Sequence, residues 1–221
     1  MATSSFSKGI KEIQDQVLVM GEVVAKEISR SIEALKARDL KTAHRIIADD
    51  AKIDQMRFAI EDKLIELMGV PKPAVADRRT IVALLSISTE LERIGDYAEG
   101  IAKIVVLIGD EPPLKPLIDI PRMAELTIDM INKSLKSFVD RDVELAKRVV
   151  SMDTSVDGLY DQVFRELLTF MMVDPKTITR ATRLIWVAHN LERAADRVTN
   201  ICERVVFTVT GKMTDLEISK Y

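Results

Sequence analysis

Apolar residues recur along most of this chain in alternating steps of three and four, which is the period of an amphipathic α-helix. The clearest run comes late in the first half of the sequence and is repeated, position for position, 100 residues later. Its members are Leu84, Ile87, Leu91, Ile94, Ala98, Ile101 and Val105, and their counterparts are Leu184, Val187, Leu191, Ala194, Val198, Ile201 and Val205. A stripe with this spacing predicts a helix that packs lengthwise against others in a bundle.

Each half contains two further segments with the helical period. The first helix is indicated by Ile10, Ile13, Val17, Met20 and Val24, and its counterpart is expected at residues 119 to 140. The middle helix is indicated by Ile53, Met56, Ile60 and Leu67, and its counterpart by Val156, Leu159, Val163 and Phe170. Because no strand-like alternation competes, the sequence predicts six helices, with breaks near 38–39, 69–73, 140–142 and 174–175.

The densest group of helix breakers divides the chain into near-equal halves. It runs from Gly109 to Pro121 and holds four prolines in thirteen residues. Residues 34–54 align with 137–157 at a constant offset of 103, which indicates an internal duplication. We therefore predict an all-α fold of two tandem, similar three-helix bundles: a first repeat at 1–109, a Pro-rich linker at 110–118 and a second repeat at 119–221.

Composition narrows the class of protein further. Apolar residues make up 47% of the chain, and 32 basic residues nearly balance 35 acidic ones, so no overall attraction to nucleic acid is expected. Cys202 is the only cysteine, which excludes an intrachain disulfide and suits a reducing compartment. No apolar run approaches the ~20 residues that span a bilayer. We expect a cytoplasmic protein that meets a membrane only peripherally, through a partner.

Four pairs of acidic residues are the candidate site. In each pair the two acids are four residues apart, so they share a helix face with about 5–6 Å between their Cβ atoms and repel each other. If the middle helix of each half lies antiparallel to the last one, four carboxylates per half meet on an outer surface. Clustered oxygen ligands suit hard or borderline cations such as iron, zinc, manganese, magnesium or calcium. The pairs are Asp50 with Asp54, Glu92 with Asp96, Asp153 with Asp157, and Glu192 with Asp196.

A simpler interpretation of these acids stays open. Acidic residues on the outer face of a helix are usually solvated, and Arg93 and Arg193 can form surface ion pairs worth only ~0–1 kcal/mol with them. The recurrence of the pairs at matched places in both halves favours a shared role. Without a cation the carboxylates should point away from one another. The expectation for the structure is therefore that the acids of one half lie on a common face, whatever the distances between their oxygens.

No catalytic constellation is found in the sequence. The only histidines are His44 and His189, and His189-x-x-Glu192 reverses the Glu-x-x-His order of ferritin-like di-iron proteins. Cys202 is expected to be a small buried thiol. Neither a GxSxG nucleophile elbow nor a phosphate-binding glycine loop occurs. We therefore expect a non-enzymatic interaction protein; a carboxylate-bridged metal-dependent enzyme and a metal-free helical scaffold are the alternatives.

Four segments resemble the PhoU family, the accessory regulators of the phosphate-specific transport system. The signature helices are STELERIGDYAEGIAKIV at 88–105 and AHNLERAADRVTNICERVV at 188–206, and the helices before them are at 49–62 and 152–167. The resemblance implies two three-helix bundles and metal ions or small metal clusters at the eight paired acids. It also implies a negative regulator of the phosphate-starvation response, an adaptor between a phosphate ABC transporter and a sensor histidine kinase. A homodimer or other homo-oligomer is expected.

Two departures from the family pattern bear on the candidate metal sites. Gly100 stands where the second repeat has Asn200 and the family often has Asn, and Glu99 corresponds to Thr199. We therefore expect the two acidic surfaces to be unequal.

Overall fold

Six α-helices make up most of the computed structural model, which describes residues 2–69, 75–214 and 216. No strand occurs in these ranges, so the all-α prediction is confirmed. The break expected at 69–73 lies mostly outside the described residues, whereas the segment expected at 119–140 coincides with α4. The helices are α1 (Ala2–Ala37), α2 (Leu40–Met68), α3 (Val75–Ile108), α4 (Asp119–Asp140), α5 (Val143–Val173) and α6 (Ile178–Thr210), and a short 3-10 turn, η1 (Pro175–Thr177), precedes α6.

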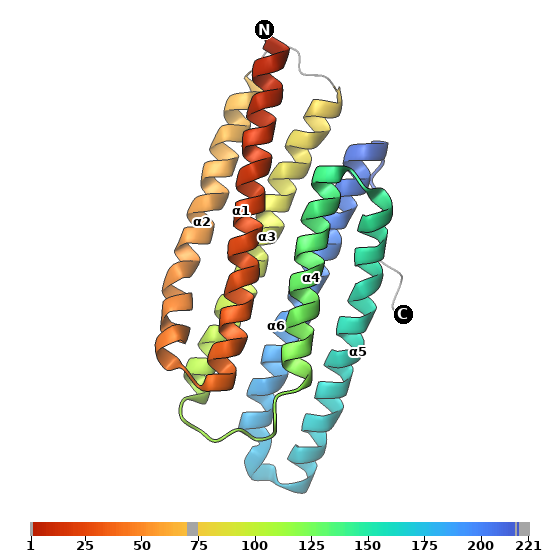
Figure 1. Ribbon diagram of the computed structural model, residues 1–221. Coiled ribbons are helices and arrows are strands. Elements are labelled where there is room, and N and C mark those ends of the chain that lie inside the picture. The colour runs from red at the N-terminus through yellow and green to blue at the C-terminus, as the bar shows by residue number, and fades with distance from the viewer. Residues whose placement is uncertain (1, 70–74, 215, 217–221) are drawn as a thin grey trace.

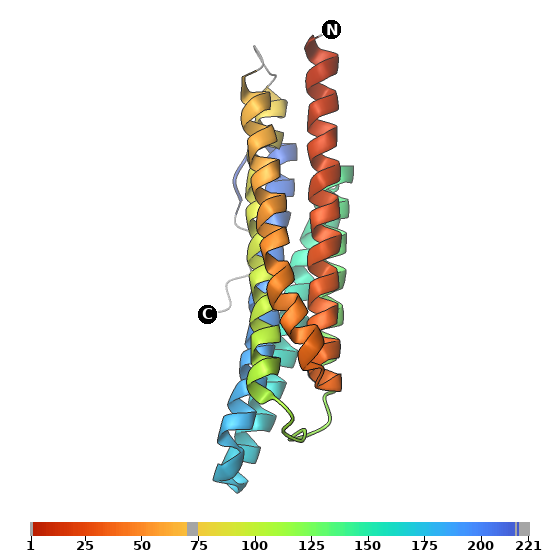
Figure 2. The ribbon, with the colours of Figure 1, turned by 90° about the vertical axis from the view of Figure 1, so that its left-hand side faces the viewer.

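The two repeats lie side by side and share one core (Figure 1). Within each repeat, consecutive helices run in opposite directions and pack against one another. Between the repeats, α3 packs along α6 and α1 packs against α4. Figure 2 shows α1 and α4 on one side of the molecule and α3 and α6 on the other. Leu91 and Leu191 are both 0% exposed, so the prediction that they occupy equivalent buried positions is confirmed.

The first helix of each repeat ends in the same way. Arg38 and Arg141 adopt the left-handed conformation, with φ of 56° and 54°. The N–H of the next residue, Asp39 or Asp142, donates to a carbonyl five residues earlier at 2.9 Å, as in a Schellman motif. The carboxylate of each Asp then accepts the N–H three residues later and caps the following helix. The repeated Arg-Asp pair therefore encodes a repeated turn.

The break expected at 174–175 is present, and Asp174 caps a short element there. The Asp174 carboxylate accepts the N–H of Lys176 at 3.0 Å, and Pro175 is the first residue of the turn. This turn is the 3-10 element η1, and α6 begins only at Ile178. The Asp cap and the proline thus start the helical conformation at the expected break, and one tight turn precedes the regular helix.

Paired contacts along α3 and α6 reflect the duplication. Glu90 Oε2 accepts a hydrogen bond from Asn200 Nδ2 at 3.2 Å. Asn190 is the counterpart of Glu90, and Gly100 is the counterpart of Asn200. These two positions also meet, because a Cβ added at Gly100 would lie 2.7 Å from Asn190 Oδ1. This contact between α3 and α6 therefore recurs with the two helices exchanged, as an internal two-fold arrangement requires.

Candidate carboxylate site

The structure brings five carboxylates of the first repeat together. Asp50 and Asp54 lie on α2, and Glu92, Asp96 and Glu99 lie on α3, which packs against α2. Burial, together with the negative charges of Glu99, Asp96 and Asp54, raises the pKa of Asp50 to about 6, and burial is the largest cause. We call this group the first-repeat cluster. The negative charges of its other members thus disfavour ionisation of Asp50.

Asp96 and Glu92 of the first-repeat cluster show the same effect. Burial raises the pKa of Asp96, and the charges of Asp54 and Glu99 add to the increase. Burial also raises the pKa of Glu92, with Asp96 adding to it and the Arg57 guanidinium opposing it. Carboxylates that repel in this way favour any positive charge placed among them.

Cations reach only the edges of the first-repeat cluster. Arg57 Nε lies 3.6 Å from Glu92 Oε1, and Arg57 also pairs with Glu61 on its own helix. Lys103 Nζ lies 2.5 Å from Glu99 Oε2. Within the described ranges no Lys or Arg forms an ion pair with the three aspartates, which are Asp50, Asp54 and Asp96.

Glu99 is the member that the acid-x-x-x-acid search missed, because it forms no four-residue pair with another acid. It lies seven residues after Glu92 and three after Asp96, so it shares their helix face. Its counterpart in the second repeat, Thr199, is 1% exposed and donates its hydroxyl to the backbone carbonyl of Asp196 at 2.7 Å. The helical period was the signal that would have found Glu99.

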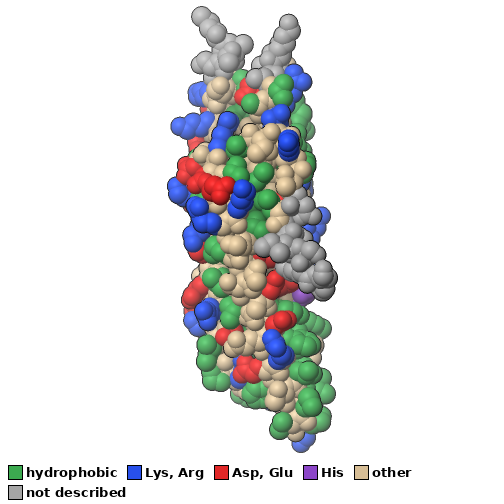
Figure 3. All heavy atoms as spheres, turned by 90° about the vertical axis from the view of Figure 1, so that its right-hand side faces the viewer, with side chains coloured by type: hydrophobic (Ala, Val, Ile, Leu, Met, Phe, Trp, Pro, Cys, Tyr) green, Lys and Arg blue, Asp and Glu red, His purple; other side chains and the backbone are tan. Residues whose placement is uncertain are grey.

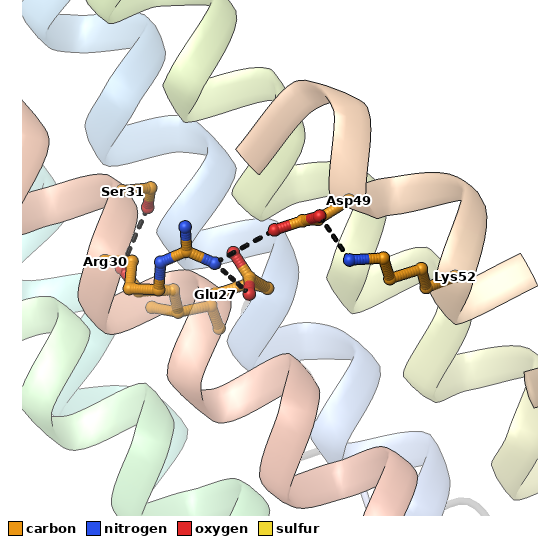
Figure 4. A network of polar contacts seen from close by, with 6 residues as sticks. Glu27, Arg30, Ser31, Asp49 and Lys52 are labelled. Carbon is orange, nitrogen blue, oxygen red and sulfur yellow. Dashed lines mark hydrogen bonds and ion pairs between the residues drawn. The ribbon is translucent and has the colours of Figure 1, made fainter. Parts of the chain in front are cut away.

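A polar network beside the first-repeat cluster sets the orientation of α2 (Figure 4). Arg30 on α1 pairs with Asp49 at 3.3 Å and with Glu27 at 2.6 Å, and Lys52 pairs with Asp49 at 2.6 Å. Because Asp49 faces α1, the neighbouring Asp50 is turned toward the acids of α3. Two adjacent aspartates therefore lie in opposite electrostatic environments. The hydrogen bond from Lys52 lowers the pKa of Asp49 and outweighs the opposing effect of desolvation.

Replacing each of these two aspartates by Asn tests the arrangement. Asp50→Asn is expected to raise the free energy of unfolding near pH 7.5 by about 1 kcal/mol, allowing for solvent screening of a partly exposed group. The raised pKa makes ionised Asp50 a destabilising group, so this gain should shrink as the pH falls through about 6 and vanish near 4. The measurement is urea unfolding across this pH range in buffer containing a chelator.

Asp49→Asn is the matched control, and it should change the free energy of unfolding in the opposite direction. The lowered pKa of Asp49 means that its charge stabilises the fold above the pKa of the unfolded chain, near 4, and that this contribution is lost at lower pH. Asp49→Asn should therefore destabilise the protein at pH 7.5. Equal effects of the two substitutions would contradict the arrangement.

The acids of the second repeat have different neighbours. Asp196 Oδ2 accepts a hydrogen bond from Arg193 Nη1 at 2.7 Å, and Glu192 Oε2 lies 3.5 Å from His189 Nδ1. The ring of Tyr160, which replaces Arg57 of the first repeat, is tilted against the His189 ring, with 6.1 Å between their centroids. Burial raises the pKa of Tyr160, and the charge of Glu192 adds to this.

Asp153 departs from the expected outward-facing position. It is 5% exposed, because it lies between Val149 and Val156 on the buried stripe of α5. Asp157 is partly exposed on the same helix. The two acidic surfaces are therefore unequal. In the first repeat, burial and neighbouring acids raise the pKa of Asp50, Glu92 and Asp96, whereas acids in the second repeat lie beside Arg, His and Tyr side chains.

The donor set of the first-repeat cluster fits a hard cation in chemistry, but the side chains are not arranged for coordination. All five donors are carboxylates, the ligands that calcium, magnesium and manganese prefer. Among the described residues, no group of three or more His, Cys, Asp or Glu side chains converges to hold a metal ion. Binding a cation would require the carboxylates to rotate toward one another, as their mutual repulsion leads us to expect.

The other reactive side chains lie outside this site. Cys202 is fully buried, and burial raises its pKa to about 12, so the thiol stays protonated and unreactive near neutral pH. The prediction of a buried thiol is confirmed. His44 is exposed on α2, away from the stripe of α2 that faces the core.

Fold and site together define a duplicated helical protein with an acidic face on the last two helices of the first repeat. The family model for the PhoU domain matches residues 17–105 and 120–205, once in each repeat. This chain therefore belongs to the PhoU family.

Relatives and solved structures cover nearly the whole chain. The phosphate-specific transport system accessory protein PhoU homolog of Clostridium acetobutylicum is 36% identical over 98% of this chain and 99% of its own. The homolog of Aquifex aeolicus is 39% identical over 84% of each chain. The crystal structure of the phosphate transport system regulatory protein PhoU from Streptococcus pneumoniae has a TM-score of 0.89 at 30% identity, covering 95% of this chain and 99% of that one. PhoU from Pseudomonas aeruginosa has a TM-score of 0.88 at 30% identity, covering 94% and 100%.

Proposed function

We propose that this protein is a cytoplasmic negative regulator of the phosphate-starvation response and a modulator of phosphate uptake. It acts as an adaptor between a phosphate ABC transporter and a sensor histidine kinase, as a homodimer and without a nucleic-acid partner. One observation carries the proposal: the PhoU domain matches both repeats, and relatives spanning almost the whole chain are named accessory proteins of the phosphate-specific transport system.

Binding rather than catalysis is the proposed mode of action. An adaptor requires exposed apolar surface, and Figure 3 shows hydrophobic side chains gathered toward the lower end of the α5 side. Phe164, Leu168 and Met172 follow one another at intervals of four on α5 and are 41%, 43% and 79% exposed. No helix among the described residues is long and apolar enough to cross a membrane. In this proposal, contact with the transporter is made through its protein surface.

A divalent cation at the first-repeat cluster is part of the proposal. Asp50, Asp54, Glu92 and Asp96 would hold it, and their mutual repulsion supports this assignment. The second set, Asp153, Asp157, Glu192 and Asp196, is the counterpart by duplication. Iron, zinc, manganese, magnesium and calcium are the candidate ions, and the bound charge would relieve the repulsion and stiffen the contact between α2 and α3.

The test is phosphate-regulated gene expression in a strain that lacks this protein. Loss of the gene should leave a phosphate-responsive reporter active in high phosphate, and the wild-type gene should restore repression. Cys202→Ala and His189→Ala should also restore it at equal protein level, because no covalent step is proposed. A deletion strain with normal repression would refute the regulatory function, and loss of repression on changing Cys202 alone, in a folded protein, would favour an enzyme.

A further inference from the structure

A half-open pocket of about 250 Å³ lies at the end of the molecule where the linker between the repeats crosses from α3 to α4 (Figure 1). We call it the end pocket. Its walls come from the ends of α1 and α3, the start of α6 and linker residues 111–117. Apolar side chains dominate the lining, among them Leu35, Ile108, Leu114 and Leu184. Because both repeats contribute, an occupant would touch both at once.

Contacts with the helices hold the linker in place around the end pocket. Arg183 Nη1 on α6 lies 3.4 Å from Glu111 Oε1. Lys115 is only 8% exposed and pairs with Glu166 on α5. Three prolines in the linker restrict its backbone further. A wall that is already ordered lowers the entropy cost of binding.

Basic side chains outnumber acidic ones around the end pocket. Its lining includes Lys36, Arg38, Lys115 and Arg180, and one acid, Glu111, which pairs with Arg183. Lys36 pairs with Glu33 and Lys115 with Glu166, so both of these ammonium groups have acidic partners.

The two arginines of this lining have no acidic partner within the described part of the chain. Arg38 Nη1 reaches the carbonyl oxygen of Asp110 at 3.5 Å, and Arg180 Nη1 reaches that of Pro112 at 3.3 Å. These contacts are long and use one nitrogen of each guanidinium. Most of the N–H donors of both side chains are therefore available, in a fork that matches a carboxylate.

The backbone of Arg38 provides a way to separate binding from folding. Its left-handed conformation is the one that glycine adopts without strain, whereas other residues adopt it at a cost of about 1 kcal/mol. Arg141 has the same conformation at the matching turn of the second repeat, but it does not line the end pocket. Replacing either arginine by Gly removes the guanidinium and preserves the turn.

We propose that the end pocket binds an acidic segment of a partner protein, with one large apolar side chain in the pocket and flanking carboxylates on Arg38 and Arg180. The volume favours a peptide anchor, because sites that enclose small organic ligands usually measure about 300–1,000 Å³. A buried apolar anchor surrounded by ion pairs is the usual form of an interaction hot spot. This inference rests on the proposed adaptor function and names one surface through which that function is exerted.

Fluorescence anisotropy with the full-length protein tests the proposal. The probe is a fluorescein-labelled hexapeptide in which Phe-Leu is flanked by two acidic residues on each side, and the comparison peptide has Lys in place of every acid. Saturable binding of the acidic peptide is expected, at least tenfold tighter than that of the basic one and weakened by salt. Arg38→Gly and Arg180→Gln should each weaken it at least tenfold, with unfolding midpoints close to that of the wild type. Arg141→Gly, the matched control, should bind like the wild type.

Several results would overturn the proposal. Equal affinity for both peptides, or wild-type affinity in Arg38→Gly and Arg180→Gln, would do so. Binding of decanoate without binding of the acidic peptide would show that the occupant of the end pocket is a small amphiphilic anion and not a partner segment. Self-association that Arg38→Gly abolishes, without binding of the peptide, would show that the occupant is a second copy of this chain.

The reporter strain separates this inference from the proposed function. Intact repression by a wild-type protein that binds no acidic peptide would reject the end pocket and leave the regulatory function standing. Peptide binding that Arg38→Gly abolishes, together with normal repression in the deletion strain, would support the end pocket and reject the regulatory function.

Discussion

Changing Glu92 to Gln and Asp96 to Asn together is expected to weaken the binding of a divalent cation roughly 100-fold or more. Interactions with a charged group contribute about 1.5–3 kcal/mol each, and each 1.4 kcal/mol is tenfold in affinity. The amides keep the size of the acids and remove two of the five repelling charges, so the fold should be retained or stabilised. Isothermal titration of metal-free protein with Mn²⁺ measures the effect.

A matched control for this double variant lies on α2. Asp62 and Glu66 are also four residues apart, and both are exposed. Changing Asp62 to Asn and Glu66 to Gln removes the same charge without touching the first-repeat cluster, and Mn²⁺ affinity should stay within about twofold because distant surface charges are screened. An unchanged affinity in the Glu92/Asp96 variant would show that the cluster is not the cation site.

The corresponding change in the second repeat should have a smaller effect. Glu192 and Asp196 already lie beside His189 and Arg193, so a cation gains less by entering there. Changing Glu192 to Gln and Asp196 to Asn is therefore expected to weaken Mn²⁺ binding less than the first-repeat variant does. An equal loss would indicate that the two acidic surfaces act alike despite their different neighbours.

Leu91→Ala is expected to lower the free energy of unfolding by about 2–5 kcal/mol. Leu91 is 0% exposed and lies in the region where the repeats meet, since Gly21 of α1 approaches both Leu91 and Leu135 of α4. Truncation there leaves a cavity that helices from both repeats would have to move to fill. Leu191→Ala should have a similar cost, because Leu191 is equally buried.

Urea unfolding monitored by circular dichroism measures both variants. Leu107→Ala is the control, because Leu107 lies on α3 as well but is 56% exposed, and its truncation should cost less than about 0.5 kcal/mol. A loss below about 1 kcal/mol for Leu91→Ala would contradict the placement of this side chain at the centre of a shared core.

Local features of the sequence were sufficient to predict the helices and, in the first repeat, the shared faces of the paired acids. The three-four period located the buried stripes, and the turns that end α1 and α4 lie at the breaks expected near 38–39 and 140–142. Both signals depend on residues a few positions apart on one helix, where spacing alone sets direction. For the same reason the shared face of Glu92 and Asp96 followed from their spacing.

Only the tertiary structure decided which faces meet. The pairing of Arg30 with Asp49 turns Asp50 toward α3, where Glu99 joins the acids. In the second repeat, Tyr160 and Arg193 give the corresponding acids different neighbours. The end pocket likewise exists because the linker crosses between the ends of α1, α3 and α6. A helical period fixes the direction of a side chain about its own axis, but the rotation and axial offset of one helix against another depend on packing between distant segments, which no local pattern encodes.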